Sequence, residues 1–271
     1  MKEQKVKPNC ERCGRPIKSP ADCGTEADGT IKPNHCKNCY AGGEFFIDEK
    51  DRQRFNIDVE FRSQLSGTVL DIGCGVDPFK SLKFLEKPSL ESAFAIDTSE
   101  TVIRNLKKEL PHQKIKYLTL GAEDLPKLKK RFNYIFCYFS LGHFDNPGDC
   151  LKNISRCLKK GGKLMLAEEL PKKASRGFVP TNDKRQIRNQ RQMAPVLSGA
   201  QKEEMMRYIR GKLPKISEKD ARQVLEAYRL HGRMIIFKQE IKSLLSMAGL
   251  KLLKECQERR EWFAIFIKTR D

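Results

Sequence analysis

Two pairs of cysteines near the amino terminus have the spacing of metal ligands. Cys10 and Cys13 form one Cys-x-x-Cys pair, and Cys36 and Cys39 form a second in this 271-residue chain. Each pair folds two thiolates onto one ion, and two pairs complete a closed tetrahedral site of the kind that holds structural Zn²⁺. We therefore predict a structural zinc site with these four ligands.

The segment around these cysteines is too short to fold on a hydrophobic core of its own. Residues 8–46 are rich in Cys, Gly, Pro and Asn, and such segments need a metal or another cross-link. Cys23 and His35 are surplus ligands, so a site that uses either of them remains open. A closed site has no open position for substrate, and we expect the zinc to stabilise residues 1–49 as a small zinc ribbon.

A glycine-rich turn in the sequence VLDIGCGVDP forms the second candidate site. Gly73 and Gly75 follow a predicted strand and allow the backbone to approach a ligand closely. A dinucleotide fingerprint needs a third glycine where this chain has Pro78. Asp71 stands two residues before the first glycine, where a carboxylate suits the ammonium and sulfonium groups of S-adenosyl-L-methionine.

A second carboxylate is expected close to this turn. Asp97 ends the next predicted strand, 26 residues after Asp71. A carboxylate at that place accepts hydrogen bonds from both hydroxyls of a ribose. It would do the same for the ribose of NAD, so Asp97 alone does not distinguish the two cofactors.

The elements that must position these residues alternate between strand and helix from Thr68 onwards. We predict strands in TVLDIG, SAFAID, IKYLTL, FNYIFCYF and KLMLAEE. Helices are predicted in PFKSLKFLEK, ETVIRNLKKEL and PGDCLKNISRCLKK, around 217–230 and around 238–248. LKLLKECQ and EWFAIFIKT follow as a hairpin. This order predicts a Rossmann-like, doubly wound α/β fold with a mostly parallel sheet and an antiparallel C-terminal hairpin in residues 50–271.

Residues 66–170 resemble the class I S-adenosylmethionine-dependent methyltransferases, particularly those of ubiquinone and menaquinone biosynthesis. The matching pieces are VLDIGCG, AIDTS, GAEDLP, FNYIFCYFSLGHF and ISRCLKKGGKLMLAEE. The stretch from Cys10 to Phe46 is similar to a family of small zinc-ribbon domains. The first resemblance implies a methyltransferase that binds S-adenosyl-L-methionine, and the second supports the zinc site.

The resemblance to methyltransferases also assigns further residues to the cofactor. It places adenine contacts near Ala122 and Glu123, and it puts Tyr138 and Phe139 near the transferred methyl group. The predicted cofactor-binding set is Asp71, Gly73, Cys74, Gly75, Asp97, Thr98, Ala122, Glu123, Tyr138 and Phe139. The chain departs from the family pattern at Asp77, Gly121 and Asn133. Because the family often has an acidic residue at the place of Gly121, either the backbone or Glu123 would bind adenine N6.

A catalytic base is needed only when the methyl acceptor must lose a proton. His143, in SLGHF after the fourth predicted strand, is the first candidate, with Tyr138 and Glu168 behind it. The alternative, that His143 packs or caps its loop, is the interpretation we favour from the sequence. Cys74 and Cys137 are expected to be small buried side chains rather than nucleophiles.

The positive charge of the chain is unevenly distributed along the sequence. The formal net charge is +18, and residues 172–215 hold twelve basic and three acidic side chains. This segment interrupts the strand–helix rhythm where relatives place a cover over the active site, so we predict a basic cap. Its arginines would meet an anionic substrate: Arg176, Arg185, Arg188 and Arg191.

Three functions are compatible with these patterns. The first is methyl transfer to a small, anionic molecule, which the family resemblance favours. The second is RNA methylation, in which the ribbon and the basic segment bind RNA. The third is a non-catalytic module, against which the intact glycine loop and Asp97 argue. The sequence has no run of apolar residues that suits a membrane span and no signal-peptide pattern, so we expect a cytoplasmic protein. It does not predict an oligomeric state.

Overall fold

The computed structural model describes residues 9–10, 16–37, 39–45, 57–58, 60–80, 82–170, 191–192, 198–230, 233–234, 238–258 and 261–270. These residues form two compact units, Met1–Val59 and Glu60–Asp271. Each unit is described by itself below. Among the described residues, no helix has the length and apolar character needed to cross a membrane.

The first unit is built from two small antiparallel pairs of strands. β1 (Cys23–Thr25) pairs with β2 (Ile31–Cys36), and β3 (Tyr40–Ala41) pairs with β4 (Glu44–Phe45). The cluster of buried side chains beside them is small and consists mostly of cysteines: Cys10, Ile17, Cys23 and Cys36, with Cys39 packed against them. So small a core provides little hydrophobic stabilisation, in agreement with the expectation of a metal-stabilised unit.

The second unit contains a seven-stranded sheet in the order β12-β13-β9-β8-β5-β6-β7. β5 to β9 run parallel to one another, whereas β13 is antiparallel to β9 and β12 is antiparallel to β13. The bounds of the strands are Gly67–Ile72 (β5), Leu90–Asp97 (β6), Ile115–Thr119 (β7), Phe132–Tyr138 (β8), Leu158–Glu169 (β9), Leu250–Glu258 (β12) and Glu261–Lys268 (β13). The predicted fold class and the C-terminal hairpin are therefore confirmed.

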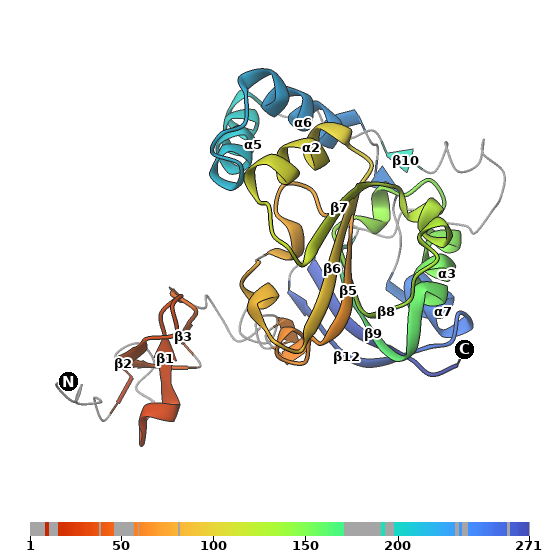
Figure 1. Cartoon of the computed structure of the whole chain (residues 1–271). Coiled ribbons are helices and arrows are strands. Elements are labelled where there is room, and N and C mark those ends of the chain that lie inside the picture. Colours follow the sequence, from red (N-terminus) through yellow and green to blue (C-terminus); the bar gives the residue numbers. More distant parts are fainter. Residues whose placement is uncertain are drawn as a thin grey trace. The chain divides into compact units, whose positions relative to one another are not determined.

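Helices cover both faces of this sheet (Figure 1). α2 (Glu100–Glu109), α5 (Gly199–Lys212) and α6 (Glu218–Leu230) gather on one side, and α3 (Pro147–Cys157) and α7 (Lys238–Met247) lie on the other. The side chains of Ser99 and Asn146 cap α2 and α3 by accepting hydrogen bonds from Val102 N and Asp149 N. The core between the sheet and α3 and α7 includes Trp262, Phe132 and Ile154, all fully buried.

The expected helix over 78–87 is absent from the described residues of that segment. Two short 3-10 turns stand there instead, η2 (Pro78–Lys80) and η3 (Lys83–Glu86). Phe79 and Lys80 both have a φ of 58°, in the left-handed region, which interrupts a right-handed helix. Helix α3 is also shorter than expected, because Leu158 already pairs with Phe132 as the first residue of β9.

The basic segment contains more regular structure than its sequence predicts. Helix α5 begins after Ser198, whose side chain accepts a hydrogen bond from Gln201 N in a capping box. Upstream of it, β10 (Arg191–Gln192) pairs with β11 (Arg233–Met234) in a short antiparallel ladder. Arg176, Arg185 and Arg188 lie outside the described residues, as does the side chain of Arg191.

Candidate cofactor and metal sites

A cavity of about 350 Å³ opens where β5, β6 and β8 end. Ligands of open α/β sheets bind at this edge, and the volume is within the range of small-molecule sites. All of the predicted cofactor-binding residues line it: Asp71, Gly73, Cys74, Gly75, Asp97, Thr98, Ala122, Glu123, Tyr138 and Phe139. His143, the first candidate for a base, lines the same cavity.

The glycine loop forms the floor of the cavity. Gly73 has a φ of 66° and Gly75 a φ of 53°, which disfavours residues with a Cβ at both places. A Cβ on Gly73 would lie 2.5 Å from Oγ of Ser140, the residue that follows Phe139 after β8. Ser140 Oγ donates to the carbonyls of Gly73, at 3.2 Å, and Tyr138, at 2.8 Å. The loop after β5 and the end of β8 are therefore held together.

Asp97 is oriented by two backbone N–H groups. Gly75 N donates to its Oδ2 at 3.0 Å, and Ser99 N donates to its Oδ1 at 2.8 Å. Each carboxylate oxygen has further acceptor capacity. The residue thus presents a fixed pair of acceptors at the cavity wall, which fits the two adjacent hydroxyls of a ribose.

Asp71 is the most deeply buried carboxyl group among the residues that line the cavity. Its exposed fraction is 3%, and Phe79 N donates a short hydrogen bond to its Oδ2. Burial raises the pKa of Asp71 to about 7, although this hydrogen bond and the charge of Arg62 act in the opposite direction. The carboxyl group of Asp71 therefore holds the turn at Phe79 by a hydrogen bond, and it places a titratable group in the wall of the cavity.

Glu123 lines the cavity at η4 (Ala122–Leu128), after β7. Its Oε1 accepts a hydrogen bond from Asp145 N at 2.8 Å and one from the Cys150 thiol at 3.4 Å. Its main-chain oxygen accepts from the side-chain amide of Asn153 at 3.1 Å. These contacts fix the turn that contains Ala122 and Glu123 against α3.

The end of β8 provides an aromatic wall. Tyr138 Oη accepts a hydrogen bond from Arg62 at 3.4 Å. Phe139 has a φ of 54°, and its ring packs edge-on against Phe263 with a centroid separation of 6.0 Å. Lys80 Nζ lies 5.5 Å from the centroid of the Phe139 ring. A cation and two aromatic side chains therefore border the same part of the cavity.

His143 and Glu168 differ in their suitability for proton transfer. His143 ends η5 (Leu141–His143) and is partly exposed in the cavity wall. Glu168 is only 2% exposed and accepts backbone hydrogen bonds from Gly142 N, at 3.4 Å, and Glu169 N, at 3.0 Å. The geometry thus favours His143 over Glu168 as a group that reaches substrate. Cys74 and Cys137 are buried, and burial raises the pKa of both thiols, as expected for inert side chains.

Helices α5 and α6 complete the cavity with residues that the sequence did not single out, namely Met205, Tyr208, Val224 and Ala227. Lys212 Nζ of α5 forms an ion pair with Asp77 Oδ2 at 2.9 Å, and Tyr208 Oη donates to the same oxygen at 3.4 Å. The side chain of Asp77 therefore connects the turn after β5 to α5. The amphipathic spacing of α6 indicates that one face of this helix is buried. It does not indicate that this face lines the cavity.

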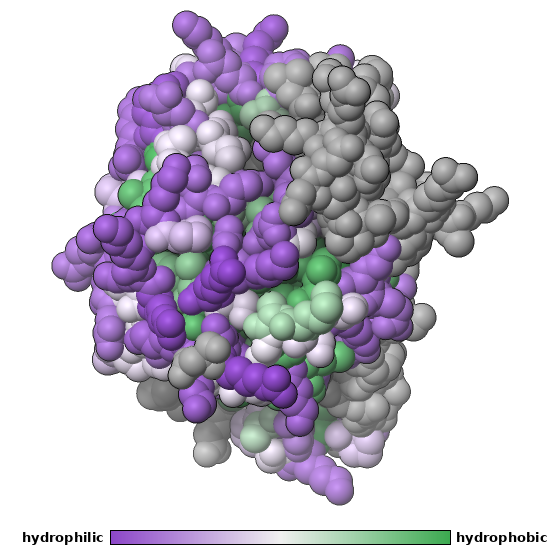
Figure 2. Space-filling view, turned by 90° about the vertical axis from the view of Figure 1, so that its right-hand side faces the viewer, coloured by the Kyte–Doolittle hydropathy of each residue, from purple (hydrophilic) through white to green (hydrophobic). Residues whose placement is uncertain are grey.

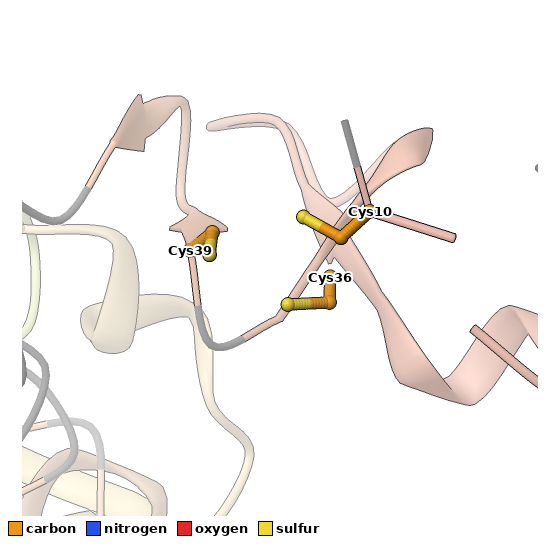
Figure 3. Close-up of side chains that lie close together, drawn as sticks. All are labelled: Cys10, Cys36 and Cys39. Carbon is orange, nitrogen blue, oxygen red and sulfur yellow. The ribbon is translucent and has the colours of Figure 1, made fainter. Parts of the chain in front are cut away.

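Three cysteines of the first unit converge on one point (Figure 3). The Sγ atoms of Cys10, Cys36 and Cys39 all lie within 4.8 Å of one another. Tetrahedral Zn²⁺ with Zn–S bonds of about 2.3 Å needs S–S distances of about 3.8 Å, so these thiols require only a small contraction. Cys13, the fourth predicted ligand, lies outside the described residues.

The surplus ligands have other contacts. The Cys23 thiol donates to the carbonyl of Ser19 at 3.8 Å and does not belong to the described cluster of three. His35 Nδ1 lies 3.0 Å from Oδ1 of Asn34. Three convergent thiols are a donor set that suits Zn²⁺.

Two known families match separate parts of the chain. Residues 70–166 match the family described as "Methyltransferase domain", and residues 9–65 match the "Putative zinc ribbon domain". A solved S-adenosylmethionine-dependent methyltransferase from Clostridium acetobutylicum has the same fold, with a TM-score of 0.50 and 16% identity over 79% of this chain and 88% of that one. Residues 70–166 of the chain therefore carry a methyltransferase domain. The glycine loop and Asp97 belong to this domain and line its cavity.

Among curated proteins, the chain is similar to enzymes named tRNA U34 carboxymethyltransferase. The one from Campylobacter jejuni strain 81-176 is 34% identical over 128 residues, which are 45% of this chain and 43% of the relative. The one from Pseudomonas aeruginosa strain LESB58 is 31% identical over 141 residues, 51% of this chain and 42% of the relative. The chain therefore spans less than half the length of these relatives.

Proposed function

We propose that this protein transfers a methyl group from S-adenosyl-L-methionine to a nucleoside of RNA, and that its ribbon holds a structural zinc ion. The observation that carries the cofactor assignment is the cavity at which Gly73, Gly75 and Asp97 converge. Both glycines leave room for a ligand against the backbone, and the oriented carboxylate of Asp97 suits a ribose.

The remaining cavity residues fit the other parts of this cofactor. Ala122 and Glu123 would border the adenine, and the loop of Gly73–Gly75 would contact the methionine portion, with Asp71 behind it to balance positive charge. When bound, S-adenosyl-L-methionine supplies an electrophilic methyl group on a sulfonium. The resulting displacement is in line, so much of the rate acceleration comes from holding the acceptor atom in line with the methyl group and the sulfur.

Residues of this chain would position the acceptor. Tyr138, fixed by Arg62, and Phe139, fixed by Phe263, would form the wall against which a planar acceptor packs. His143 stands in the same wall and would take the proton if the acceptor atom must lose one. A His143→Gln substitution then lowers kcat at least tenfold without changing cofactor affinity, whereas a purely structural His143 would alter Tm and leave kcat nearly unchanged.

RNA is favoured as the acceptor class by two observations. The curated relatives are named for a modification of tRNA. The net charge of +18 also suits a polyanionic partner, because lysine and arginine contacts to phosphates dominate affinity for nucleic acid. S-adenosyl-L-methionine carries a methyl group and not the carboxymethyl group for which the relatives are named, so the proposal for this chain is methyl transfer.

A small, anionic acceptor is the second candidate, and it is the one that the sequence alone favoured. The closure of the cavity by α5 and α6 supports it, since Met205, Tyr208, Val224 and Ala227 restrict the space beside the loop. In this alternative Arg191 of β10 would bind the anionic group of the acceptor. β10 pairs with β11, and β11 contacts η5, which ends at His143.

The test is to incubate purified, zinc-replete protein with methyl-labelled S-adenosyl-L-methionine and an extract of its own host. Under the proposal, label enters an acid-precipitable, RNase-sensitive fraction, and Asp97→Ala protein leaves the extract unlabelled. Mass spectrometry of the digested nucleosides then distinguishes a methyl from a carboxymethyl group. Label in the low-molecular-weight fraction would support the second candidate instead. Cofactor binding without label in any fraction would mean a non-catalytic module.

A further inference from the structure

The amino ends of the parallel strands, on the edge of the sheet opposite the cavity, carry a group of exposed lysines. We call this group the amino-edge patch. It consists of Lys116, Lys129, Lys130, Lys159 and Lys160. They come from β7, from the loop between η4 and β8, and from the start of β9. Nothing in the proposed chemistry of the cavity uses them.

The fold brings the first part of the patch together around one ring. Lys116 Nζ lies 5.7 Å from the centroid of Phe94, and Lys130 Nζ lies 5.2 Å from the same centroid. Phe94 belongs to β6 and is 6% exposed, so both ammonium groups stand at the rim of the core, next to solvent. Two residues that are 14 positions apart in sequence thus present their charges side by side.

The second part of the patch adjoins the first through β8. Lys159 Nζ donates to Oδ1 of Asn133 at 3.0 Å, and Leu158 pairs with Phe132 at the beginning of β8. Lys129 and Lys130 precede that strand by two to three residues. With about 4.8 Å between neighbouring strands, the five strands from β9 to β7 make the patch about 19 Å wide.

The charge of the patch is available to a partner. None of its five lysines forms an ion pair with another residue in the part of the chain that the structure describes. Other surface cations do, such as Lys127 with Asp124 at 2.9 Å and Lys152 with Asp149 at 2.9 Å. Across the face drawn in Figure 2, hydrophilic side chains predominate and hydrophobic ones form separate patches between them.

We propose that the amino-edge patch binds the sugar–phosphate backbone of the acceptor RNA while the target nucleoside occupies the cavity at the other edge of the sheet. This inference rests on the proposed function and specifies its substrate. A six-residue strand such as β5 is about 20 Å long, so one RNA must extend over at least that distance to contact both sites. The acceptor is therefore an RNA long enough to span the sheet, and an oligonucleotide shorter than that span reaches only one of the two sites.

The test compares a patch variant, K129Q/K130Q/K159Q/K160Q, with a control, K152Q/K219Q, whose lysines lie on α3 and α6. Lys116→Gln, a single substitution, serves in case the fourfold variant is unstable. Tm and cofactor affinity are measured first for each protein. Binding of total host RNA is then measured without turnover over a range of salt concentrations, and KM is measured for the labelled RNA and for a short oligonucleotide that contains its target nucleoside.

The patch variant should bind RNA at least tenfold more weakly and lose about one unit of salt slope for each phosphate contact removed, with kcat and cofactor affinity unchanged. The control should behave as the wild type, and the oligonucleotide should be a poor substrate of both. Unchanged RNA binding and salt slope in the patch variant would overturn the inference, even if RNA is methylated. Loss of binding to vesicles of phosphatidylserine with unchanged RNA binding would overturn it in favour of a membrane. If no RNA is labelled, the proposed function fails in the extract assay, separately from the binding result.

Discussion

The backbone N–H of Gly75 donates a hydrogen bond to Oδ2 of Asp97 at 3.0 Å. This bond joins the loop after β5 to the end of β6, so the residue expected to hold the ribose is oriented by the loop expected to hold the methionine portion. A substitution in the loop after β5 should therefore alter the orientation of Asp97, and a substitution of Asp97 should alter the loop.

Substitution of Asp97 tests this coupling. Asp97→Asn keeps the size of the side chain but loses a charged acceptor, and hydrogen bonds to charged groups contribute about 1.5–3 kcal/mol each. We expect the Kd for S-adenosyl-L-methionine to rise by roughly ten- to a hundredfold, measured by titration calorimetry. An unchanged Kd would remove Asp97 from the cofactor site.

The glycine loop offers a second test with a matched control. Gly73→Ala adds a Cβ at a φ of 66° and 2.5 Å from Ser140 Oγ, whereas Gly161→Ala adds one at a φ of 75° with no heavy atom within 4 Å. Left-handed strain alone costs about 1–2 kcal/mol. Chemical denaturation should show that Gly73→Ala is the more destabilising of the two, and only Gly73→Ala should abolish cofactor binding. Equal effects on stability would mean that the contact with Ser140 is unimportant.

The buried carboxyl group of Asp71 should make stability depend on pH. Its pKa is raised to about 7 by burial, above the value of about 3.9 expected in the unfolded chain. The folded state then binds the extra proton between these values, so the stability from protonated Asp71 is fully present below pH 4 and is lost as the pH rises through 7. Asp71→Asn should therefore gain stability relative to the wild type as the pH rises from 4 to 8, measured as a difference in Tm. A constant difference would contradict the raised pKa.

Metal removal should affect the two units differently. Wild-type protein should contain one zinc ion per chain, Cys36→Ser should lose it, and Cys23→Ser should keep it because Cys23 lies outside the cluster of three thiols. The single tryptophan, Trp262, is fully buried in the second unit. Its fluorescence should therefore report an intact methyltransferase domain after a chelator has unfolded the ribbon. A zinc-free Cys23→Ser protein would move the site to a different donor set.

The parts of the site that were predictable from the sequence are those close together in the chain. Gly73 and Gly75 were identified because they follow one predicted strand and Asp97 because it ends the next, and the parallel fold dictates the direction of both strands. Segment 78–87 was misread as a helix because its composition suits one, whereas Phe79 and Lys80 adopt the left-handed conformation and Phe79 N binds Asp71. In this segment the left-handed turn and its hydrogen bond to Asp71 outweigh the local helix propensity.

Contacts between distant segments were beyond the reach of sequence patterns. Met205 and Tyr208 of α5 line the cavity, and Lys212 reaches Asp77 across 135 positions, which no local pattern records. Counting charges along the chain directed attention to residues 172–215, whereas the amino-edge patch is assembled from three separate segments. The sheet order, which places β7 four strands from β9, is what brings its lysines together.

The central place of β5 in the sheet has a consequence for how the domain opens. This strand is paired on both sides, with β6 and β8, and Thr68 to Ile72 are all buried. Its amides can exchange with solvent only when most of the domain comes apart, whereas β7 and β12 at the two edges can fray in small, frequent openings. The loop that begins at Gly73 is thus attached to the slowest-exchanging strand, and transient loss of the edges leaves the floor of the cavity in place.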